Sequence, residues 1–270
     1  MICSDIARYG VKTAGEPTQG AGAVAMVISD NPALLEIDVG ISGAATTDVH
    51  DFWRPLGMRE AQVDGHYSVQ CYLDALAAAY RGWKDRAMVR EIVRDNDLAS
   101  EQLARICYHV PFCKMARKAH LHVRKCDLDD TGAPWDVTAE ETRGAASFKE
   151  QVDASLAACS RIGNVYTGSL YLSLAGLLET QAAALAGKRI GLFSYGSGCT
   201  SEFFSGVVTP RAAERMAGAP IAELLARRER ITIEEYERIM ALTSPIDAPP
   251  APGTFRYTGA VEHRRQYARG

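Results

Sequence analysis

The sequence predicts an α/β protein, and three observations support this. Short apolar runs with strand character alternate with amphipathic helical stretches along the chain. One run, Arg105 to Val110 (RICYHV), stops at Pro111 before a helical stretch, which gives a strand-to-helix corner of the kind where α/β proteins place reactive groups. The 270 residues are 47% hydrophobic and 23% charged, a balance typical of a globular chain with a large core.

The elements before this corner start with strands. SDIARYG and a Gly/Pro-rich turn precede Ala23 to Ile28, whose apolar residues predict a strand, and Leu34 to Val39 predicts a second strand. Ser68 is predicted to open an amphipathic helix. The apolar face of that helix carries Leu73, Leu76 and Tyr80.

Beyond the corner, the polar stretch Asp127 to Trp135 predicts a surface loop. Thr138 and Glu141 form a capping-box pattern for a helix running towards Gly163. Leucines at 170, 174, 177 and 178 then indicate a buried helix, which is followed by the strand KRIGLF, the loop SYGSG and the strand EFFSGVV. Thr232 and Glu235 cap a last helix, after which the proline-rich DAPPAPG leads to the short segment FRYTG. The chain has no internal repeat and no long linker.

Composition excludes several classes of partner. A net charge of −3 and a pI of about 6.1 argue against nucleic acid or an anionic membrane as the main partner. The chain has no run of 18 apolar residues, and MICSDIARYG lacks the pattern of a signal peptide, so we expect a cytoplasmic protein. Seven cysteines without a CxxC pair indicate reduced thiols. We expect no metal site at His120, His122 and Cys126, because residues two apart on a helix point away from each other.

The best candidate for chemistry is His109, at the end of the buried strand. Lys114 and Lys118 are four residues apart, so on the following helix they share one face and offer two ammonium groups to an anionic ligand. Each residue also has a structural interpretation: the histidine as a hydrogen-bonded core residue, the lysines as a solvated surface.

The loop SYGSG is a second candidate, since Gly196 and Gly198 permit positive φ and adjacent amides can form an anion-binding nest with the Ser194 hydroxyl at its mouth. A tight β-turn chosen for geometry is the alternative. Asn164 can cap a helix or hold a carbonyl group. Cys107 and Cys113 lie close to His109 in sequence, yet both fit plain packing. The spacing of the acidic residues identifies no general acid.

Six motifs in order resemble the 3-hydroxy-3-methylglutaryl-CoA (HMG-CoA) synthase family: EPTQGAGAVAM, DFWRP, VDGHYSVQCYLDAL, YHVPFCKMARKAH, GNVYTGSLYLSLAGLLE, and GLFSYGSG followed by EFFSG. This resemblance implies a thiolase-like fold with two related halves in α/β/α/β/α layers, usually as a homodimer. It also implies condensation of acetyl-CoA with acetoacetyl-CoA to HMG-CoA, without a metal or other cofactor.

The resemblance also implies roles for individual residues. His109 is similar to the catalytic histidine that positions and polarises the acetoacetyl thioester, and Lys114 and Lys118 are similar to the lysines that contact CoA. The motifs match four further positions to residues that hold the acyl group or the CoA arm; these are Thr18, Ser68, Asn164 and Ser194.

The chain departs from the family at its start. The motifs that carry the family's acetylated cysteine and its general-acid glutamate come before SDIARYG, and neither has a counterpart here. We therefore expect residues 1–50 to be the tail of the N-terminal half and 51–270 the C-terminal half, and the isolated chain to be inactive. A split enzyme with a second chain carrying the N-terminal half, a truncated gene and a noncatalytic remnant are the open explanations. The strand AVAMVI is expected to leave an open edge and an apolar face.

Two functions compete with a synthase that uses CoA. One is an HMG-acyl-carrier-protein synthase of polyketide β-branching. Such relatives resemble HTPFGGMVKGAH where this chain has CK in place of GG, which favours CoA as the donor. The other is a noncatalytic CoA-binding subunit.

Overall fold

The computed structural model describes residues 1–58, 60–94, 98–132, 134–241, 252–262 and 264–270 of the chain. They divide into two compact units, Met1–Arg228 and Glu229–Gly270. All of the candidate site residues lie in the first unit. The predicted division into 1–50 and 51–270 concerns the halves of a complete thiolase-like fold and stays a prediction.

A four-stranded mixed sheet forms the centre of the first unit. Its strands are ordered β3 (Leu35–Thr46), β8 (Thr200–Val208), β7 (Arg189–Gly196) and β6 (Arg105–Tyr108). β6 runs parallel to β7, and the other two pairs are antiparallel. The strand predicted at Leu34 to Val39 is confirmed and continues to Thr46, through a register shift between Ile37 and Ser42. In the described sheet the short strand β6 lies at the edge and pairs with the longer strand β7, so β7 positions the end of β6, where His109 follows.

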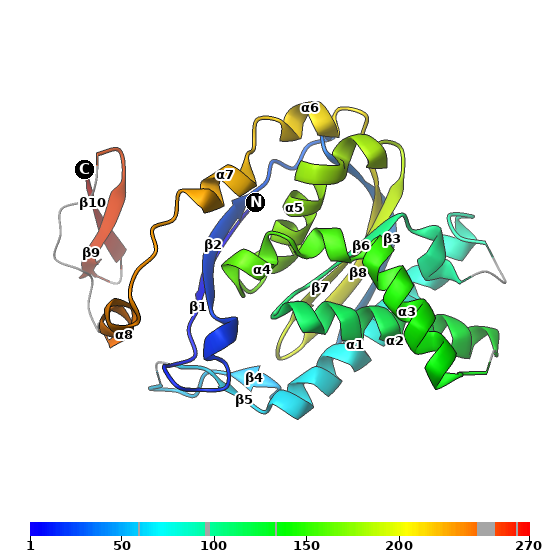
Figure 1. The fold of residues 1–270 in the computed structure, drawn as a ribbon, viewed down its shortest axis with the longest axis horizontal. Helices are drawn as coiled ribbons and strands as arrows, with labels where there is room; N and C mark the ends of the chain where they lie inside the picture. Colours follow the sequence, from blue (N-terminus) through cyan, green and yellow to red (C-terminus); the bar gives the residue numbers. More distant parts are fainter. Residues whose placement is uncertain (59, 95–97, 133, 242–251, 263) are drawn as a thin grey trace. The chain divides into compact units, whose positions relative to one another are not determined.

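Helices cover both faces of this sheet (Figure 1). Side chains alternate along the strands, so Ile106, Tyr108, Phe193 and Phe203 pack towards α1 (Gly65–Val89) and α2 (Cys113–Thr131). Cys107, Ile190, Leu192 and Val208 pack on the other face, against α5 (Gly168–Leu185). Apolar residues on both faces explain why these strands read as near-continuous hydrophobic runs.

Helix α1 lies directly on β3, backbone against backbone. The two elements meet at two glycines, where a Cβ on Gly43 would stand 1.9 Å from the Ala79 carbonyl oxygen and 2.3 Å from the Trp83 nitrogen, and a Cβ on Gly82 would stand 3.2 Å from the Gly43 Cα. Only glycine fits at Gly43, and α1 therefore approaches the sheet more closely than side chains would allow.

Three sequence predictions about helix ends were wrong. Helix α1 begins at Gly65, because the Asp64 carboxylate accepts hydrogen bonds from the amides of residues 66 and 67, and Ser68 lies inside the first turn. The predicted loop from Asp127 to Trp135 is helical up to Thr131, where Gly132 in the left-handed conformation ends α2. Asp136, and not Thr138, caps the next helix by accepting from the Ala139 amide.

The remaining elements of the first unit are short or peripheral. The helix that Asp136 caps is α3 (Val137–Gln151), which ends well before Gly163, towards which the sequence predicted it to run. The others are α4 (Cys159–Ile162), α6 (Ala212–Met216), α7 (Ile221–Ala226), the paired strands β4 (Phe52–Trp53) and β5 (Gln62–Val63), and the 3-10 helices Glu16–Thr18, Ala99–Gln102 and Asp153–Leu156. Beyond the 3-10 turn at Asp153–Leu156, α4 leads to Gly163 and so to the start of α5.

A two-stranded antiparallel ribbon, β1 (Ile2–Ala7) and β2 (Gly20–Ala25), begins the chain. The strand expected at Ala23 to Ile28 is thus shifted towards the N-terminus. In Figure 1 the ribbon lies beside α4 and α5, and contacts join β2 to both helices. A Cβ on Gly20 would stand 2.5 Å from the Asn164 carbonyl oxygen, so the ribbon's inner face rests on the backbone of that segment.

The second unit contains α8 (Ile233–Ala241) and a hairpin of β9 (Phe255–Val261) and β10 (Arg264–Arg269). The predicted cap of α8 is confirmed, because the Glu235 amide donates to the Thr232 hydroxyl at 3.1 Å. FRYTG is the start of β9, whereas most of DAPPAPG lies outside the described residues. In the described part of the chain no helix is long and apolar enough to cross a membrane.

Candidate active site

His109 stands where β6 gives way to α2, as the sequence predicts. Its amide donates to the Phe193 carbonyl at 2.7 Å, which continues the β6 and β7 ladder by one residue. Its own carbonyl accepts a hydrogen bond from the Tyr72 hydroxyl at 2.8 Å. Val110 and Pro111 then lead to α2, whose first residue is Cys113. Both backbone polar groups of His109 are therefore satisfied, and the residue is fixed to the sheet and to α1.

The imidazole of His109 is enclosed by aromatic rings. Its centroid lies 6.4 Å from that of Tyr72 and 6.2 Å from that of Tyr195, with tilted ring planes. Only 7% of the residue is exposed. Burial lowers the pKa of His109 to about 4, because the charged form loses its hydration without gaining a carboxylate partner. At neutral pH the ring is therefore uncharged, with one nitrogen that can donate and one that can accept.

In the described structure no protein group forms a hydrogen bond with the imidazole nitrogens of His109. The other histidine of this region differs: His120, on α2, bonds the Tyr108 hydroxyl through Nδ1 at 3.2 Å and Ser147 through Nε2 at 2.7 Å. His120 is therefore a hydrogen-bonded core residue, whereas the ring of His109 keeps its polar atoms for another molecule.

The nearby thiols are poorly suited to act with His109. Cys107 is fully buried on the opposite face of the sheet, and burial strongly raises its pKa. Cys113 is half-buried at the start of α2, and burial raises its pKa as well. Both therefore stay protonated near neutral pH, which is the unreactive form of a thiol.

The sequence did not predict a pair of buried hydrogen bonds beside His109, which we call the Asp51 latch. The carboxylate of Asp51, the first residue of DFWRP, accepts from the Tyr195 hydroxyl at 2.6 Å and from the Gly198 amide at 2.9 Å. Burial and this carboxylate strongly raise the pKa of Tyr195. The latch holds the turn of SYGSG against the segment before β4, and it occupies the Gly198 amide that the predicted anion-binding nest requires.

Ser194 and Ser68 lie near the histidine through different elements. The pairing of Tyr108 with Phe193 puts His109 and Ser194 at the next step of two adjacent strands. Ser194 is thus inside β7, opposite Glu202 of β8, and not in a loop as the sequence predicted. Ser68 is half-buried one helical turn before Tyr72, on the same side of α1.

Asn164 and Thr18 meet at the junction between the ribbon and α5. The backbone amide of Asn164 donates to the backbone carbonyl of Thr18 at 3.0 Å. The side chain of Asn164 donates through Nδ2 to the Tyr9 hydroxyl at 2.7 Å, and its Oδ1 accepts from the Tyr166 amide at 2.9 Å and from the Ser169 hydroxyl at 3.3 Å. The Thr18 hydroxyl donates to the Gly15 carbonyl. Here protein partners already use the polar groups of both candidates.

Lys114 and Lys118 are both exposed on the first turns of α2. They are one turn apart, which confirms that they share a helix face. Neither of them forms a salt bridge in the described structure. The two ammonium groups are therefore available to an anion in solvent.

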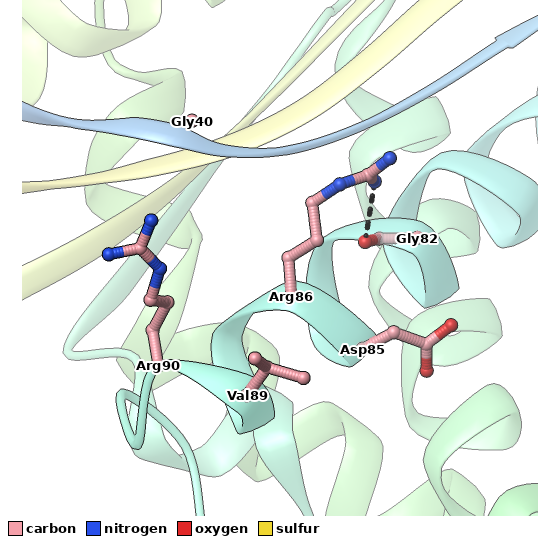
Figure 2. Close-up of a pocket in the computed structure, with 6 residues that line it drawn as sticks. All are labelled: Gly40, Gly82, Asp85, Arg86, Val89 and Arg90. Atoms are coloured by element: carbon pink, nitrogen blue, oxygen red, sulfur yellow. Dashed lines mark hydrogen bonds between the residues drawn. The ribbon is translucent and has the colours of Figure 1, made fainter.

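Two open depressions have been found in the described structure. One, of about 420 Å³, is lined by residues 46–48 and 196–200 and adjoins the Asp51 latch. The other, of about 580 Å³, is lined by Gly40, Gly82, Asp85, Arg86, Val89 and Arg90 (Figure 2). Gly82 is ten residues along α1 from Tyr72, roughly 15 Å at 1.5 Å per residue, so the larger depression is not part of the histidine site.

No group of three histidine, cysteine, aspartate or glutamate side chains within the described ranges could hold a metal ion. All seven cysteines are free thiols.

Comparison with known proteins gives consistent matches. The family model for the C-terminal part of hydroxymethylglutaryl-coenzyme A synthase matches residues 35–131 and 121–246. Hydroxymethylglutaryl-CoA synthase of Enterococcus faecalis is 36% identical over 247 residues, which are 92% of this chain and 58% of that protein. PksG of Bacillus subtilis, a polyketide 3-hydroxy-3-methylglutaryl-ACP synthase, is 33% identical over 88% of this chain and 54% of its own length.

Solved structures agree with these matches. The structure described as MvaS in complex with 3-hydroxy-3-methylglutaryl coenzyme A is 59% identical, with a TM-score of 0.93, over 100% of this chain and 66% of that chain. The HMG synthase of the curacin pathway is 31% identical, with a TM-score of 0.81, over the same shares.

These likenesses place the fold in the thiolase-like class, as the sequence motifs implied. The chain belongs to the hydroxymethylglutaryl-CoA synthase family. It spans a little over half the length of the curated relatives that it matches.

Proposed function

We propose that this chain is the later part of an HMG-CoA synthase and that it condenses acetyl-CoA with acetoacetyl-CoA once an N-terminal segment completes it. The observation that carries the proposal is the imidazole of His109, enclosed by Tyr72 and Tyr195, uncharged, and without a protein partner for its nitrogens in the described structure. The membership of the family supplies the reaction class.

In this reaction His109 positions and polarises the acetoacetyl thioester. A neutral imidazole can donate a hydrogen bond to the ketone oxygen, where negative charge develops as the new carbon–carbon bond forms. The Asp51 latch and the Tyr72 bond hold the ring's surroundings in place, which keeps the donor aligned. Lys114 and Lys118 bind the anionic part of CoA, while Ser68 and Ser194 border the acyl group.

Asn164 and Thr18 are proposed to help hold the acyl group or the CoA arm, as the resemblance implies. In the described structure the side chain of Asn164 is hydrogen-bonded within the protein, so it contacts an acyl carbonyl only if it exchanges a partner such as the Tyr9 hydroxyl. We infer a smaller catalytic share for Asn164 than for His109.

The remaining chemistry requires groups from elsewhere. A thiolate must attack acetyl-CoA, the acetyl-enzyme must lose a proton from its methyl group, and that carbon must add to the ketone. The thiols beside His109 are kept protonated by burial and cannot serve as this nucleophile. The isolated chain is therefore inactive, and its partner is a segment with the acetylated cysteine and the general-acid glutamate. We propose a cytoplasmic enzyme that assembles as a homodimer.

An acyl-carrier-protein donor is the second candidate function, because the relatives include PksG and the curacin synthase, whose structures include complexes with donor carrier protein. The Cys113 and Lys114 pair, in place of two glycines, supports CoA. A third candidate is a noncatalytic subunit that binds CoA without chemistry.

The test is to express this chain fused behind the N-terminal segment of the Enterococcus faecalis relative and to assay both donors. We expect HMG-CoA formation from acetyl-CoA. Turnover only with carrier-protein-bound acetyl groups would support the polyketide function instead. CoA binding without turnover by either donor would support the binding subunit.

Variants of this fusion test the two residue roles. His109→Ala should lower turnover by at least about 100-fold, the usual size of such a contribution, while acetylation of the cysteine persists by mass spectrometry. Lys114→Ala should raise the KM for CoA substrates several-fold with little change in kcat, since it removes binding shared by ground and transition states. Lys149→Ala, an exposed lysine on α3, is the matched control and should change neither constant.

A further inference from the structure

Polar side chains behind His109 form a continuous chain of hydrogen bonds inside the protein. The chain starts at the Tyr108 hydroxyl, which lies 3.2 Å from Nδ1 of His120. Nε2 of His120 lies 2.7 Å from the Ser147 hydroxyl, and that hydroxyl donates to Oε1 of Gln151 at 2.8 Å. Tyr108 and His120 have no exposed surface. The proposed function gives none of these four side chains a role, although the first of them is the neighbour of His109.

Gln151 connects the same chain to the segment before β6. Its Nε2 donates to the carbonyl of Leu103 at 2.6 Å and to the carbonyl of Ser100 at 2.8 Å. Leu103 lies two residues before β6 begins, and Tyr108 is the last residue of β6. The hydrogen bonds therefore hold both ends of the strand that leads to His109. They supplement a short ladder, because β6 has four residues and lies at the edge of the described sheet.

The chemistry of the side chains fixes which atom donates in each bond. Both hydrogens on Nε2 of Gln151 are used by the two carbonyls, so its Oε1 accepts. The Ser147 hydroxyl donates its hydrogen to that Oε1 and therefore accepts from Nε2 of His120. The bare Nδ1 of His120 then accepts from the Tyr108 hydroxyl. A single neutral tautomer of His120 thus satisfies the whole chain.

The surroundings of His120 keep its ring neutral. Burial and the guanidinium of Arg124 lower the pKa of His120 to about 4. Arg124 follows one turn later on α2, where it forms salt bridges with Glu140 at 3.1 Å and Glu101 at 2.8 Å. Near neutral pH the imidazole therefore carries one hydrogen and keeps an acceptor for the Tyr108 hydroxyl.

The bond between Tyr108 and His120 closes the corner that carries the candidate residues. It joins the end of β6 to α2 across 12 positions of sequence, and His109, Lys114 and Lys118 all lie between its two ends. Helix α2 begins without a side-chain cap. In the part of the chain that the structure describes, no other side-chain hydrogen bond joins β6 to α2. The placement of the imidazole relative to the lysine face therefore depends on this bond.

We propose that the hydrogen bond between Tyr108 and His120 is a clasp that sets the position of the His109 imidazole relative to the two lysines of α2. Tyr108 and His120 are thereby positioning residues of the condensation, and they act through His109. The inference rests on the proposed function, in which a thioester held by the lysines presents its ketone oxygen to the imidazole. A small misplacement of a catalytic group lowers the rate strongly, so the clasp should matter for turnover.

The first experiment compares two buried tyrosines that both donate to α2. Tyr108→Phe removes the clasp and keeps the ring. Tyr80→Phe, the matched control, removes two hydrogen bonds to the Asp127 carboxylate, outside the corner. In the fusion described above, Tyr108→Phe should lower kcat at least about fivefold and change the KM for acetoacetyl-CoA less than about twofold, because the lysines still bind CoA.

Tyr80→Phe should lower the melting temperature at least as much as Tyr108→Phe, because it removes bonds to a charged group, and yet leave kcat within about twofold. If kcat fell in proportion to the melting temperature in both variants, Tyr108 would have a structural role only and the proposal would be wrong.

The second experiment asks whether both side chains act through one bond. His120→Asn keeps an acceptor oxygen near the place of Nδ1 and should retain about half of kcat or more, whereas His120→Leu removes the acceptor and should match Tyr108→Phe. The double variant Tyr108→Phe/His120→Leu should be no slower than the slower single variant, since both changes remove the same bond. Effects on kcat that multiply would contradict the clasp. If His120→Leu does not fold, the kcat of Tyr108→Phe and of His120→Asn decides.

A measurement on the 270-residue chain separates this proposal from the proposed function. Nitrogen-15 NMR of the imidazoles should place the hydrogen of His120 on Nε2. The His109 amide, which donates to Phe193, should exchange with solvent at least about tenfold faster in Tyr108→Phe than in Tyr80→Phe. A hydrogen on Nδ1, or equal exchange in the two variants, would refute the clasp whether or not the fusion is active.

The two proposals therefore fail separately. The expected NMR and exchange results together with a fusion that forms no HMG-CoA would leave the clasp standing and reject the proposed function. An active fusion whose kcat is the same with Tyr108→Phe would support the function and reject the positioning role.

Discussion

The corner at His109 and the junction at Asn164 are both buried, and both were predicted to contact the substrate, yet the protein treats their polar atoms differently. The ring of His109 is enclosed by Tyr72 and Tyr195 but has no protein hydrogen bond in the described structure, whereas the Asn164 amide group bonds Tyr9, Tyr166 and Ser169. The nitrogens of His109 are not among the fully buried side-chain atoms that lack a partner, so the ring is enclosed yet remains open to a ligand. The difference teaches that Asn164 uses its polar atoms to hold the fold together, whereas His109 keeps its ring nitrogens for a bound molecule.

The largest expected difference between the two regions is in their response to acid. The pKa of His109 is lowered to about 4 from an unfolded value near 6.5, so between these pH values the imidazole is protonated in the unfolded chain and neutral in the folded chain. The folded state should therefore lose stability as the pH falls from about 6.5 to 4, by up to roughly 3 kcal/mol. Burial also lowers the pKa of His120 to about 4, and this histidine adds to the same slope.

Urea unfolding at several pH values measures this effect. His109→Gln should flatten the slope between pH 6.5 and 4 without removing the part due to His120. Asn164→Ala should leave the slope unchanged, because an amide does not titrate. If His109→Gln left the pH dependence of the free energy of unfolding unchanged, the imidazole would be charged in the folded protein over this range.

The second effect is the stability that Asn164 supplies. Asn164→Ala removes the partner of the Tyr9 hydroxyl and of the Tyr166 amide, so the free energy of unfolding should fall by roughly 2 to 3 kcal/mol. Tyr9→Phe removes only one of these bonds and should cost less than half as much. Equal stability of Asn164→Ala and the unchanged chain would contradict the structural role of this side chain.

The smallest effect sharpens the description of the His109 corner. Tyr72→Phe keeps the ring beside the imidazole and removes the hydrogen bond to the His109 carbonyl, which should lower the free energy of unfolding by about 1 kcal/mol. In the fused enzyme the same change should lower kcat more than it raises KM, since it loosens a positioning contact and no binding contact. Tyr171→Phe, a half-buried tyrosine of α5, is a control that should leave both constants unchanged.

The spacing of apolar and charged residues and the position of Pro111 predicted much of this fold. RICYHV followed by proline specified a buried strand and its end, and the spacing of Lys114 and Lys118 specified their common face. Local signals were weaker where two residues competed for one role. At the start of α1 the carboxylate of Asp64 reaches two amides and prevails over Ser68, and nothing in a single sequence ranks those two caps.

Contacts between distant segments could not be predicted. Asp51 bonds Tyr195 and Gly198 across about 145 positions of sequence, and Tyr9 bonds Asn164 across a similar distance. Each partner is unremarkable in its own segment, so only the folded arrangement shows that one pair holds the histidine site and the other uses up an amide. The motif DFWRP contained a signal, because an aspartate next to apolar residues is costly to bury unless it has a hydrogen-bond partner.

The glycine crossing between α1 and β3 has a mechanical consequence. A helix that rests on a sheet through side chains can slide by letting them change rotamer, whereas Gly43 and Gly82 bring two backbones into contact and leave nothing to rearrange. Tyr72 and Ser68 lie on this helix, so their positions relative to the sheet are fixed as well. The wall that α1 contributes to the histidine site is therefore fixed against β3 before any thioester arrives, and a bound ligand must adapt to it.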